Sequence, residues 1–253
     1  MSVPEAHDIR LGDVAVSMPD GRHGGFTRKG FLSAPPVELR GAVFEMKSDH
    51  RVHDNRVEEF ISAMLQKGSG LIDYRRPPSA SDVLFAADYQ HVASNNRGTC
   101  KHGDPEHIIQ RPRRAHSCSR IHYGLIASGD RVMRSAIKRD LEVQNLGDGV
   151  LCFEMEAAGL STEFSYLVIR GISNYADSHK NDAWQHYAAA AAAACTKEVL
   201  TYLDPAAPMP SSSHSDDSWA VNGSRGHVNF SGTDVQSLGS FPVGRDFSVG
   251  GKR

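Results

Sequence analysis

Two apolar segments that end in polar residues constrain the fold of this chain most strongly. The first reads VLCFEMEAAGL over residues 150–160 and carries a Glu-Met-Glu triplet at 154–156. The second reads YLVIRGISNYADS over residues 166–178 and carries Ser-Asn at 173–174. Apolar runs of this kind are typical of buried strands, and polar residues that follow such strands gather at one edge of a sheet. The sequence therefore predicts one sheet edge that holds both polar groups, and we place the active site there.

Strand patterns alternate with helix patterns along the chain. Residues 11–17 (LGDVAVS) and 121–127 (IHYGLIA) have the composition of strands, and further strands are predicted through 152–153 and 167–169. The last strand leads into a helix predicted over 182–203, whose alanine run is typical of a buried, closely packed helix. This alternation predicts an α/β fold with a central sheet flanked by helices.

Two shorter helices are predicted from their apolar periodicity. The first runs over 55–66 with Asn55 as its cap, and the second runs over 130–141 after a Ser-Gly-Asp turn. Their apolar residues fall on one face of each helix and are expected to point inward: Val57, Phe60, Ile61 and Leu65 in the first, and Val132, Met133, Ile137 and Leu141 in the second.

Charge and cysteine content limit the classes of function. The chain has 253 residues, a formal net charge of −2 and a pI near 6.7, which give no electrostatic reason to expect binding to nucleic acids or membranes. We expect small-molecule or protein partners. The sequence has no run of roughly 18 apolar residues and no apolar signal-peptide centre, so we expect a cytoplasmic protein. Few cysteines for the length favour free thiols, with Cys152 and Cys195 in the core.

Composition divides the chain into three parts. Residues 1–204 carry the periodic patterns of a globular domain, residues 205–226 are a linker rich in Pro, Ser and Asp, and residues 227–253 form a Gly-rich tail. The tail is expected to be disordered, although it weakly resembles the glycine-punctuated segments through which some fungal receptor proteins assemble with protein partners. Within the domain, residues 68–118 are predicted to be a long loop region with little apolar sequence, which is called the excursion below.

The excursion contains two clusters with a simple interpretation. Its cysteines and histidines have spacings that differ from those of common zinc sites, which favours a polar loop over a metal site: Cys100, His102, His107, His116 and Cys118. Its basic run over 111–116 is predicted to be a solvated loop face in a protein with near-zero charge. We also expect His179 and Lys180 to be surface residues beside the active site.

The Glu-Met-Glu triplet leaves several chemistries open when it is considered alone. Glu154 and Glu156 are alternate residues, so on a strand they share a face, while Met155 points to the other. Paired carboxylates suit binding a sugar diol, holding a metal or acid–base catalysis. A solvated start of a helix, favoured by the helix dipole, explains the same spacing equally well.

Four motifs resemble one enzyme superfamily. Residues 11–17, 124–133 (GLIASGDRVM), 153–159 (FEMEAAG) and 168–178 (VIRGISNYADS) resemble, in order and spacing, the purine nucleoside phosphorylase and methylthioadenosine nucleosidase superfamily. The resemblance extends over about residues 8–203. It is closest to the phosphorylase-like domains of fungal proteins, which often precede nucleotide-binding receptor modules, and it implies a mixed central sheet flanked by helices.

The resemblance implies roles for particular residues in cleavage of a purine N-glycosidic bond. Glu156 would accept both ribose hydroxyls, with Glu154 beside it, and Met155 would pack beneath the sugar. Val132 and Met133 would line the base pocket. Arg170 and Ser173 would support residue 174, which meets the imidazole nitrogen of the purine. No cofactor is implied, and phosphate is a co-substrate if the reaction is phosphorolysis.

The residue at position 174 departs from the superfamily pattern. Most members have aspartate there, whereas this chain has Asn174, whose amide donates a hydrogen bond but transfers no proton. General acid catalysis contributes about 10² to 10⁴-fold, so activity that needs the acid would be weakened. Members that act on 6-oxopurines use asparagine in this role. Asp177 is the nearest other carboxylate and is the weaker candidate for the acid.

The resemblance also suggests what this chain lacks and leaves two functions open. Members carry early strands and a Gly-rich segment before the LGDVAVS motif, whereas only ten residues precede Leu11, so those strands and the nucleophile site are expected to be missing.

The first candidate function is binding and cleavage of a purine nucleoside by a homo-oligomer. The alternative is a non-catalytic nucleoside-sensing or interaction module in receptor-type signalling.

Overall fold

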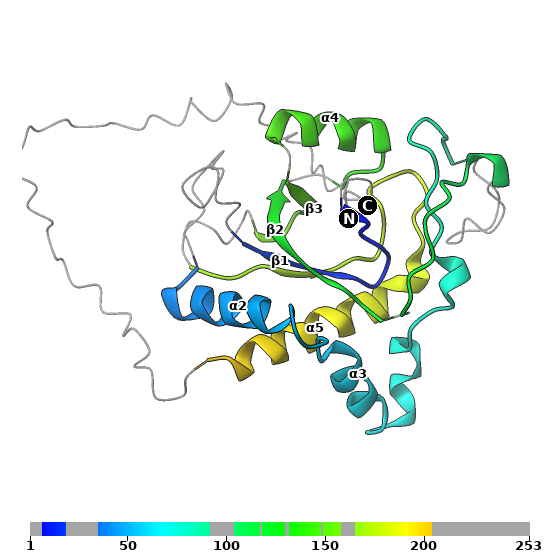
Figure 1. Cartoon of the computed structure of the whole chain (residues 1–253). Helices are drawn as coiled ribbons and strands as arrows, with labels where there is room; N and C mark the ends of the chain where they lie inside the picture. Colours follow the sequence, from blue (N-terminus) through cyan, green and yellow to red (C-terminus); the bar gives the residue numbers. More distant parts are fainter. Residues whose placement is uncertain are drawn as a thin grey trace, which may run out of the picture. The chain divides into compact units, whose positions relative to one another are not determined.

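The fold is a mixed α/β domain built around one sheet (Figure 1). The structure is a computed structural model. It describes residues 7–18, 35–91, 104–116, 118–129, 132–147, 149–157 and 165–203. The predicted linker and tail lie outside the described residues, as do Cys100 and His102, so the domain boundaries stay predictions.

The sheet has the strand order β3-β2-β1-β4 and contains both strand directions. β1 (Val14–Ser17) is parallel to β2 (Ile121–Ser128), and β2 is parallel to β3 (Val150–Glu154). β4 (Ile169–Gly171) is antiparallel to β1. The mixed sheet predicted from the sequence is therefore confirmed, although β1 and β4 begin later than their apolar runs suggest.

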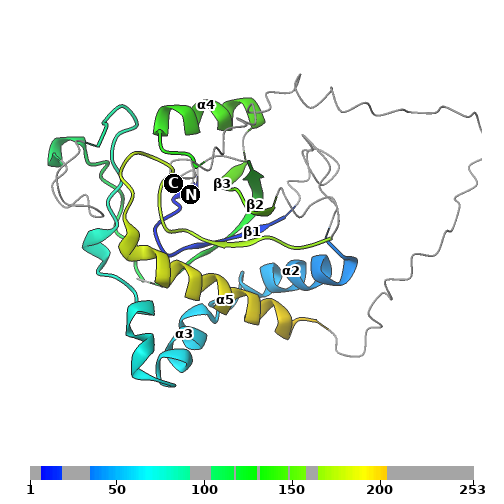
Figure 2. The same cartoon turned by 180° about the vertical axis from the view of Figure 1, so that it is seen from behind.

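Helices cover both faces of this sheet. Figure 2 shows from behind that α2 (Val37–Asp49), α3 (Val57–Leu65) and α5 (Gln185–Thr201) lie on one side and α4 (Ala136–Leu146) lies on the other. The apolar core fills the layer between the strands and the first group of helices. Its members include Val14, Val16, Met46, Val57, Ile172, Trp184, Cys152 and Cys195, which are all fully buried.

Close packing of α5 on the sheet follows from small residues on both sides. The helix predicted over 182–203 is confirmed as a 3₁₀ turn at Asp182–Trp184 that continues into α5. Alanine side chains form its buried face, and a Cβ atom added at Gly171 would lie 1.9 Å from the carbonyl oxygen of Ala188. Gly171 therefore allows β4 and α5 to approach to backbone contact.

A second glycine, Gly12, allows the residues before β1 to pack closely against aromatic side chains at the start of α5. Gly12 has a φ of +86°, and a Cβ atom there would lie 2.6 Å from Tyr187 Cε1 and 2.9 Å from Trp184 Cζ3. Because glycine alone adopts this conformation without strain, residues 11–13 turn into β1 directly against these two rings.

The helix before the Glu-Met-Glu triplet differs from the prediction. It begins at Ala136 rather than at residue 130, after Ser135, whose hydroxyl accepts the N–H of Lys138 at 3.4 Å. The predicted inward face is wrong, because Val132, Ile137 and Leu141 are 47%, 55% and 54% exposed. Arg139 is buried instead, and its Nη1 donates to the carbonyl oxygen of Tyr175 at 2.8 Å. This polar contact, which apolar periodicity does not reveal, sets which face of α4 is turned inward.

The helix predicted over 55–66 is confirmed as α3, although it begins at Val57 and the residue at its N-cap is Arg56 rather than the predicted Asn55. Asn55 Oδ1 accepts the N–H of Val57 at 3.2 Å, and Val57 and Ile61 are buried as expected. α2 was not predicted, and its buried residues are Ala42, Val43 and Met46. A helix that buries so few side chains has a weak apolar period.

Replacement of Gly171 by alanine tests the contact between β4 and α5. The new Cβ atom would overlap backbone atoms that cannot move as a flexible side chain can, so we expect Gly171→Ala to lower the free energy of unfolding by about 3 kcal/mol. Urea denaturation measures the change. Gly41→Ala is the control, because Gly41 lies in exposed α2 with open space around it and the change should stabilise by about 0.5 to 1 kcal/mol. An unchanged urea midpoint for Gly171→Ala would contradict the packing.

Candidate functional site

Glu154 organises the turn that follows β3. Its side chain is buried, and Oε2 accepts the backbone N–H groups of Glu156 at 2.9 Å and Ala157 at 2.7 Å. These two bonds hold the turn that carries Met155 and Glu156 in one conformation. The second oxygen, Oε1, is buried and has no hydrogen-bond partner among the described residues. Glu154 is therefore a buried residue that stabilises the turn. Glu154 and Glu156 do not share a face as expected, because Glu156 is exposed.

Glu156 presents an ionised carboxylate at the surface of this turn. Its side chain is 66% exposed, and Oε2 lies 2.7 Å from Nη1 of Arg170. Oε2 also accepts the N–H of Met155 at 3.2 Å. Partial burial acts to raise the pKa of Glu156, but the Met155 amide and the Arg170 guanidinium outweigh it and hold the pKa below its ordinary value. Glu156 is thus available as an acceptor at neutral pH.

Further polar and apolar residues lie in or next to these strands. Ser128 is the last residue of β2 and is paired in register with Glu154. Ser128 Oγ and Arg170 Nε are both buried and, within the described ranges, lack a hydrogen-bond partner. Met155, which lies between Glu154 and Glu156 in sequence, is 38% exposed, whereas Val132 and the half-buried Met133 lie in the segment between β2 and α4. The roles of Met155, Val132 and Met133 toward a substrate stay predictions.

Asn174 forms a local turn with its neighbours. Its Oδ1 accepts the N–H of Ala176 at 3.1 Å, and its Nδ2 donates to Ser173 Oγ at 3.4 Å. Ala176 has a φ of +58°, a left-handed conformation that costs a non-glycine residue about 1 to 2 kcal/mol. The turn engages the amide oxygen with the backbone and directs Nδ2 toward Ser173, and the role of the NH₂ group toward a ligand stays a prediction.

The direction of β4 corrects the expectation of a single sheet edge. β4 is antiparallel to β1, so residues 173–174 leave the sheet where β1 begins, whereas residues 154–156 follow the end of β3. The N–H of Ile172 accordingly donates to the carbonyl oxygen of Asp13 at 2.8 Å. Polar residues that follow two strands lie at the same edge of a sheet only when the strands are parallel. The structure brings Glu156 and Arg170 together, while proximity of Glu156 to Asn174 stays a prediction.

Asp177 and His179 form a buried pair that the sequence did not indicate. Asp177 Oδ1 accepts the backbone N–H of His179 at 2.9 Å, and its Oδ2 lies 3.8 Å from His179 Nδ1. The His179 ring stacks on Phe85 at 4.2 Å between ring centroids. Burial lowers the pKa of His179, although Asp177 acts to raise it. The surface position predicted for His179 is wrong, while Lys180 is exposed as expected.

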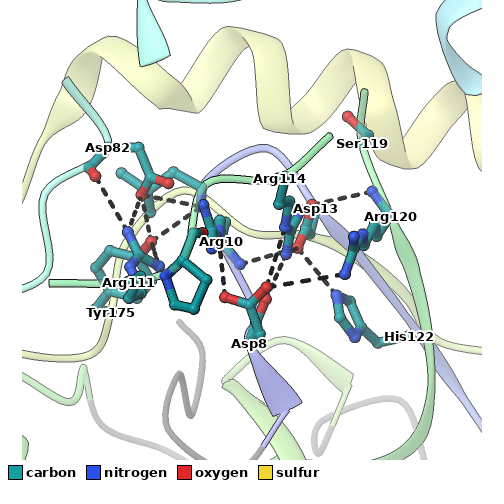
Figure 3. A network of polar contacts seen from close by, with 12 residues as sticks. Asp8, Arg10, Asp13, Asp82, Arg111, Arg114, Ser119, Arg120, His122 and Tyr175 are labelled. Carbon is teal, nitrogen blue, oxygen red and sulfur yellow. Dashed lines mark hydrogen bonds and ion pairs between the residues drawn. The ribbon is translucent and has the colours of Figure 1, made fainter. Parts of the chain in front are cut away.

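A network of ion pairs surrounds the start of β1 (Figure 3). Asp13 is fully buried, and Arg114 binds it through two parallel bonds, Nη1 to Oδ1 and Nη2 to Oδ2, each 2.8 Å long. Asp13 also accepts the backbone N–H of Arg120 at 3.0 Å and lies 3.0 Å from His122 Nε2. One carboxylate thus joins β1, the first residues of β2 and the end of the excursion.

A second cluster extends the network beside the first. Arg111 donates from Nη1 to the Tyr175 hydroxyl at 2.8 Å, and its Nη2 lies 3.1 Å from Asp82 Oδ1. Tyr175 donates in turn to the same carboxylate. The predicted solvated face over residues 111–116 is therefore wrong for Arg111 and Arg114, which are 12% and 7% exposed. Their partners are distant in sequence, so the basic run alone resembled a surface loop.

Comparison with known proteins gives one informative relative. No protein-family model matches the chain. The chain is 36% identical over 222 residues to a nucleotide-binding leucine-rich repeat (NLR)-like protein of Hyaloscypha variabilis, an alignment that covers 82% of this chain and 21% of the relative. The chain thus spans about a fifth of the length of that protein. In the part of the chain that the structure describes, no helix is long and apolar enough to cross a membrane.

The Asp13 network predicts a loss of stability in acid. Burial acts to raise the pKa of Asp13, but His122 and Arg114 lower it from 3.8 to about 2. A depressed pKa contributes stability that is complete above about pH 4 and is lost as the pH falls through 2, and the shift corresponds to about 2 kcal/mol. We expect Asp13→Asn to remove this part of the pH dependence. Urea denaturation at pH 4.5 and pH 2.5 measures the difference.

The matched control for this prediction is Asp54→Asn, because Asp54 is exposed on the surface. That variant should lose as much stability between the two pH values as the unmodified chain. Equal pH dependence in Asp13→Asn and the unmodified chain would show that Asp13 is not the group responsible.

Proposed function

We propose that this chain binds a purine nucleoside at the ends of β2 and β3 and cleaves its N-glycosidic bond. The similarity of four sequence motifs to nucleoside phosphorylases and nucleosidases suggests the reaction. The observation that carries the proposal is a set of unsatisfied polar atoms in the strands that lead to Glu156 or contact it: within the described residues, Ser128 Oγ, Glu154 Oε1 and Arg170 Nε are buried without a hydrogen-bond partner. Buried polar groups of this kind are costly unless a ligand or water completes them.

The chemistry of Glu156 suits recognition of the sugar. An ionised carboxylate accepts hydrogen bonds from both hydroxyls of a ribose diol, and Arg170 orients that carboxylate at 2.7 Å. Met155 supplies an exposed, flexible apolar side chain next to it, which suits contact with a sugar face. The nucleoside is thus proposed to bind through its ribose before any bond is broken.

The proposed reaction breaks the bond between the anomeric carbon and the purine nitrogen. The electron pair moves to the purine, the ribose acquires oxocarbenium character, and water or phosphate adds to the anomeric carbon. The departing purine takes up a proton from the solvent, and water acting as the nucleophile releases one to the solvent. Asn174 would donate a hydrogen bond from its NH₂ group to the purine as charge develops there, since an amide transfers no proton. A 6-oxopurine nucleoside such as inosine is the substrate that fits an amide in this position.

A non-catalytic function is the second candidate. The relative's name, NLR-like protein, is compatible with receptor-type signalling, and this chain corresponds to about a fifth of that protein. In such a protein the same domain would bind a nucleoside without cleaving it and would report the ligand to other domains. The two functions share the Glu156 site and differ only in turnover.

Substitution of Glu156 tests the ribose contact common to both functions. We expect Glu156→Gln to weaken inosine binding by about tenfold or more, because charge-assisted hydrogen bonds to the diol are lost. Glu59→Gln is the control, since Glu59 is also an exposed carboxylate paired with an arginine, Arg56, at 2.7 Å. Isothermal titration calorimetry measures the affinities. Equal inosine binding in Glu156→Gln and the unmodified chain would remove the basis of the proposal.

Asn174→Asp separates catalysis from sensing. Release of free base from inosine, adenosine and methylthioadenosine is measured with and without phosphate, for the unmodified chain and for the variant. If the Asn174 amide promotes cleavage by donating a hydrogen bond to the purine, we expect the unmodified chain to cleave inosine. A gain of about 10² to 10⁴-fold on adenosine in the variant would indicate that a general acid had been lost. Binding without base release by either protein would contradict the enzyme and favour the sensing module.

A further inference from the structure

A cavity of about 450 Å³ lies between two parts of the excursion, residues 76–84 and 108–118. Arg10, which precedes β1, also lines it, so the cavity is associated with the amino end of β1, whereas Glu156 follows the carboxyl end of β3. None of the residues assigned to the nucleoside site lines this cavity. It is therefore a separate site.

The polar lining of the cavity is dominated by cations. Five arginines line it, together with a single carboxylate, that of Asp82: Arg10, Arg76, Arg111, Arg113 and Arg114. The carboxylates of Asp8, Asp13 and Glu58, which pair with some of these arginines, are not part of the lining. The cavity is therefore lined by arginine residues, and most of the carboxylates that pair with them belong to residues outside the lining.

These guanidinium groups are fixed before any ligand binds. Arg114 is held by Asp13 and Arg111 by Asp82 and Tyr175, as Figure 3 shows. Arg10 Nε is held by Asp8 at 2.9 Å. A rigid group of arginines loses little side-chain entropy when an anion arrives, and guanidinium forks match the geometry of phosphate oxygens.

Two arginines retain unused binding capacity. Arg76 donates from Nη1 to the Tyr187 hydroxyl at 2.8 Å, but its buried Nε has no hydrogen-bond partner among the described residues. Arg113 is exposed and, over the same described ranges, makes no hydrogen bond or ion pair. An unpaired buried N–H and an uncompensated charge in one cavity are the features that an anion would satisfy.

The volume of the cavity indicates what kind of anion would fit. Small-molecule sites usually measure about 300 to 1,000 Å³, and one water molecule occupies only about 30 Å³ of liquid. Phosphate alone would leave much of this cavity empty. Apolar side chains, including Val83, Ile108 and Ile109, form another part of the lining and suit an uncharged body. We propose that this cavity binds an organic phosphate ester, with its phosphate on the arginines and its apolar body on these side chains.

Phenyl phosphate is a suitable probe because it has a phosphate and an apolar body but no ribose diol for Glu156 to bind. Isothermal titration calorimetry at low salt would compare it with inorganic phosphate and with phenol. We expect phenyl phosphate to bind more tightly than inorganic phosphate, and phenol not to bind. Arg113→Gln should weaken phenyl phosphate binding by about tenfold, because one charged contact is lost.

Two further variants make the result specific. Arg51→Gln removes the same charge from an exposed position outside the cavity and should leave phenyl phosphate affinity unchanged. Glu156→Gln should also leave it unchanged, so failure of the nucleoside proposal would not affect this one. No binding of phenyl phosphate, equal weakening by Arg51→Gln and Arg113→Gln, or equal affinity for inorganic phosphate would each overturn the proposal.

Discussion

The buried contact between Asp13 and Arg114 is the interaction on which the rest of this structure depends. A fully buried carboxylate is tolerated only when its charge and its hydrogen-bonding capacity are satisfied, and Arg114 supplies a bidentate partner at 2.8 Å. The same carboxylate binds the backbone of Arg120, which precedes β2, so the contact fixes both central strands. Loss of one partner would leave an uncompensated charge in the core.

This network explains how the excursion, whose described residues form no named strand, becomes part of the domain. Arg111 and Arg114 tie the end of the excursion to Asp82 and Asp13, and Asn181 and Trp184 bind Ser81 from the α5 side. These contacts enclose space between the two parts of the excursion. The arginine-lined cavity is thus a consequence of the same ion pairs that stabilise the fold.

The two candidate sites have different physical origins. The turn after β3 is held by a buried carboxylate, Glu154, which frees Glu156 to act as an exposed acceptor. The cavity is lined by five arginines, and most of the carboxylates that pair with them belong to residues outside its lining. An acceptor for hydroxyl groups and a group of donors for phosphate oxygens have opposite chemistry, so the two sites are expected to bind different parts of a ligand or different ligands.

The sequence by itself determined the α/β class, the strands β2 and β3, the helices α3 and α5 and the buried alanine face, because apolar periodicity and helix propensity are local properties. Only the tertiary structure decided that β4 is antiparallel, that α4 turns Arg139 rather than Ile137 inward, and that His179 is buried. Tertiary structure also decided that Arg111 and Arg114 are interior residues. Each of these outcomes depends on contacts between residues far apart along the chain, and no local pattern encodes such contacts.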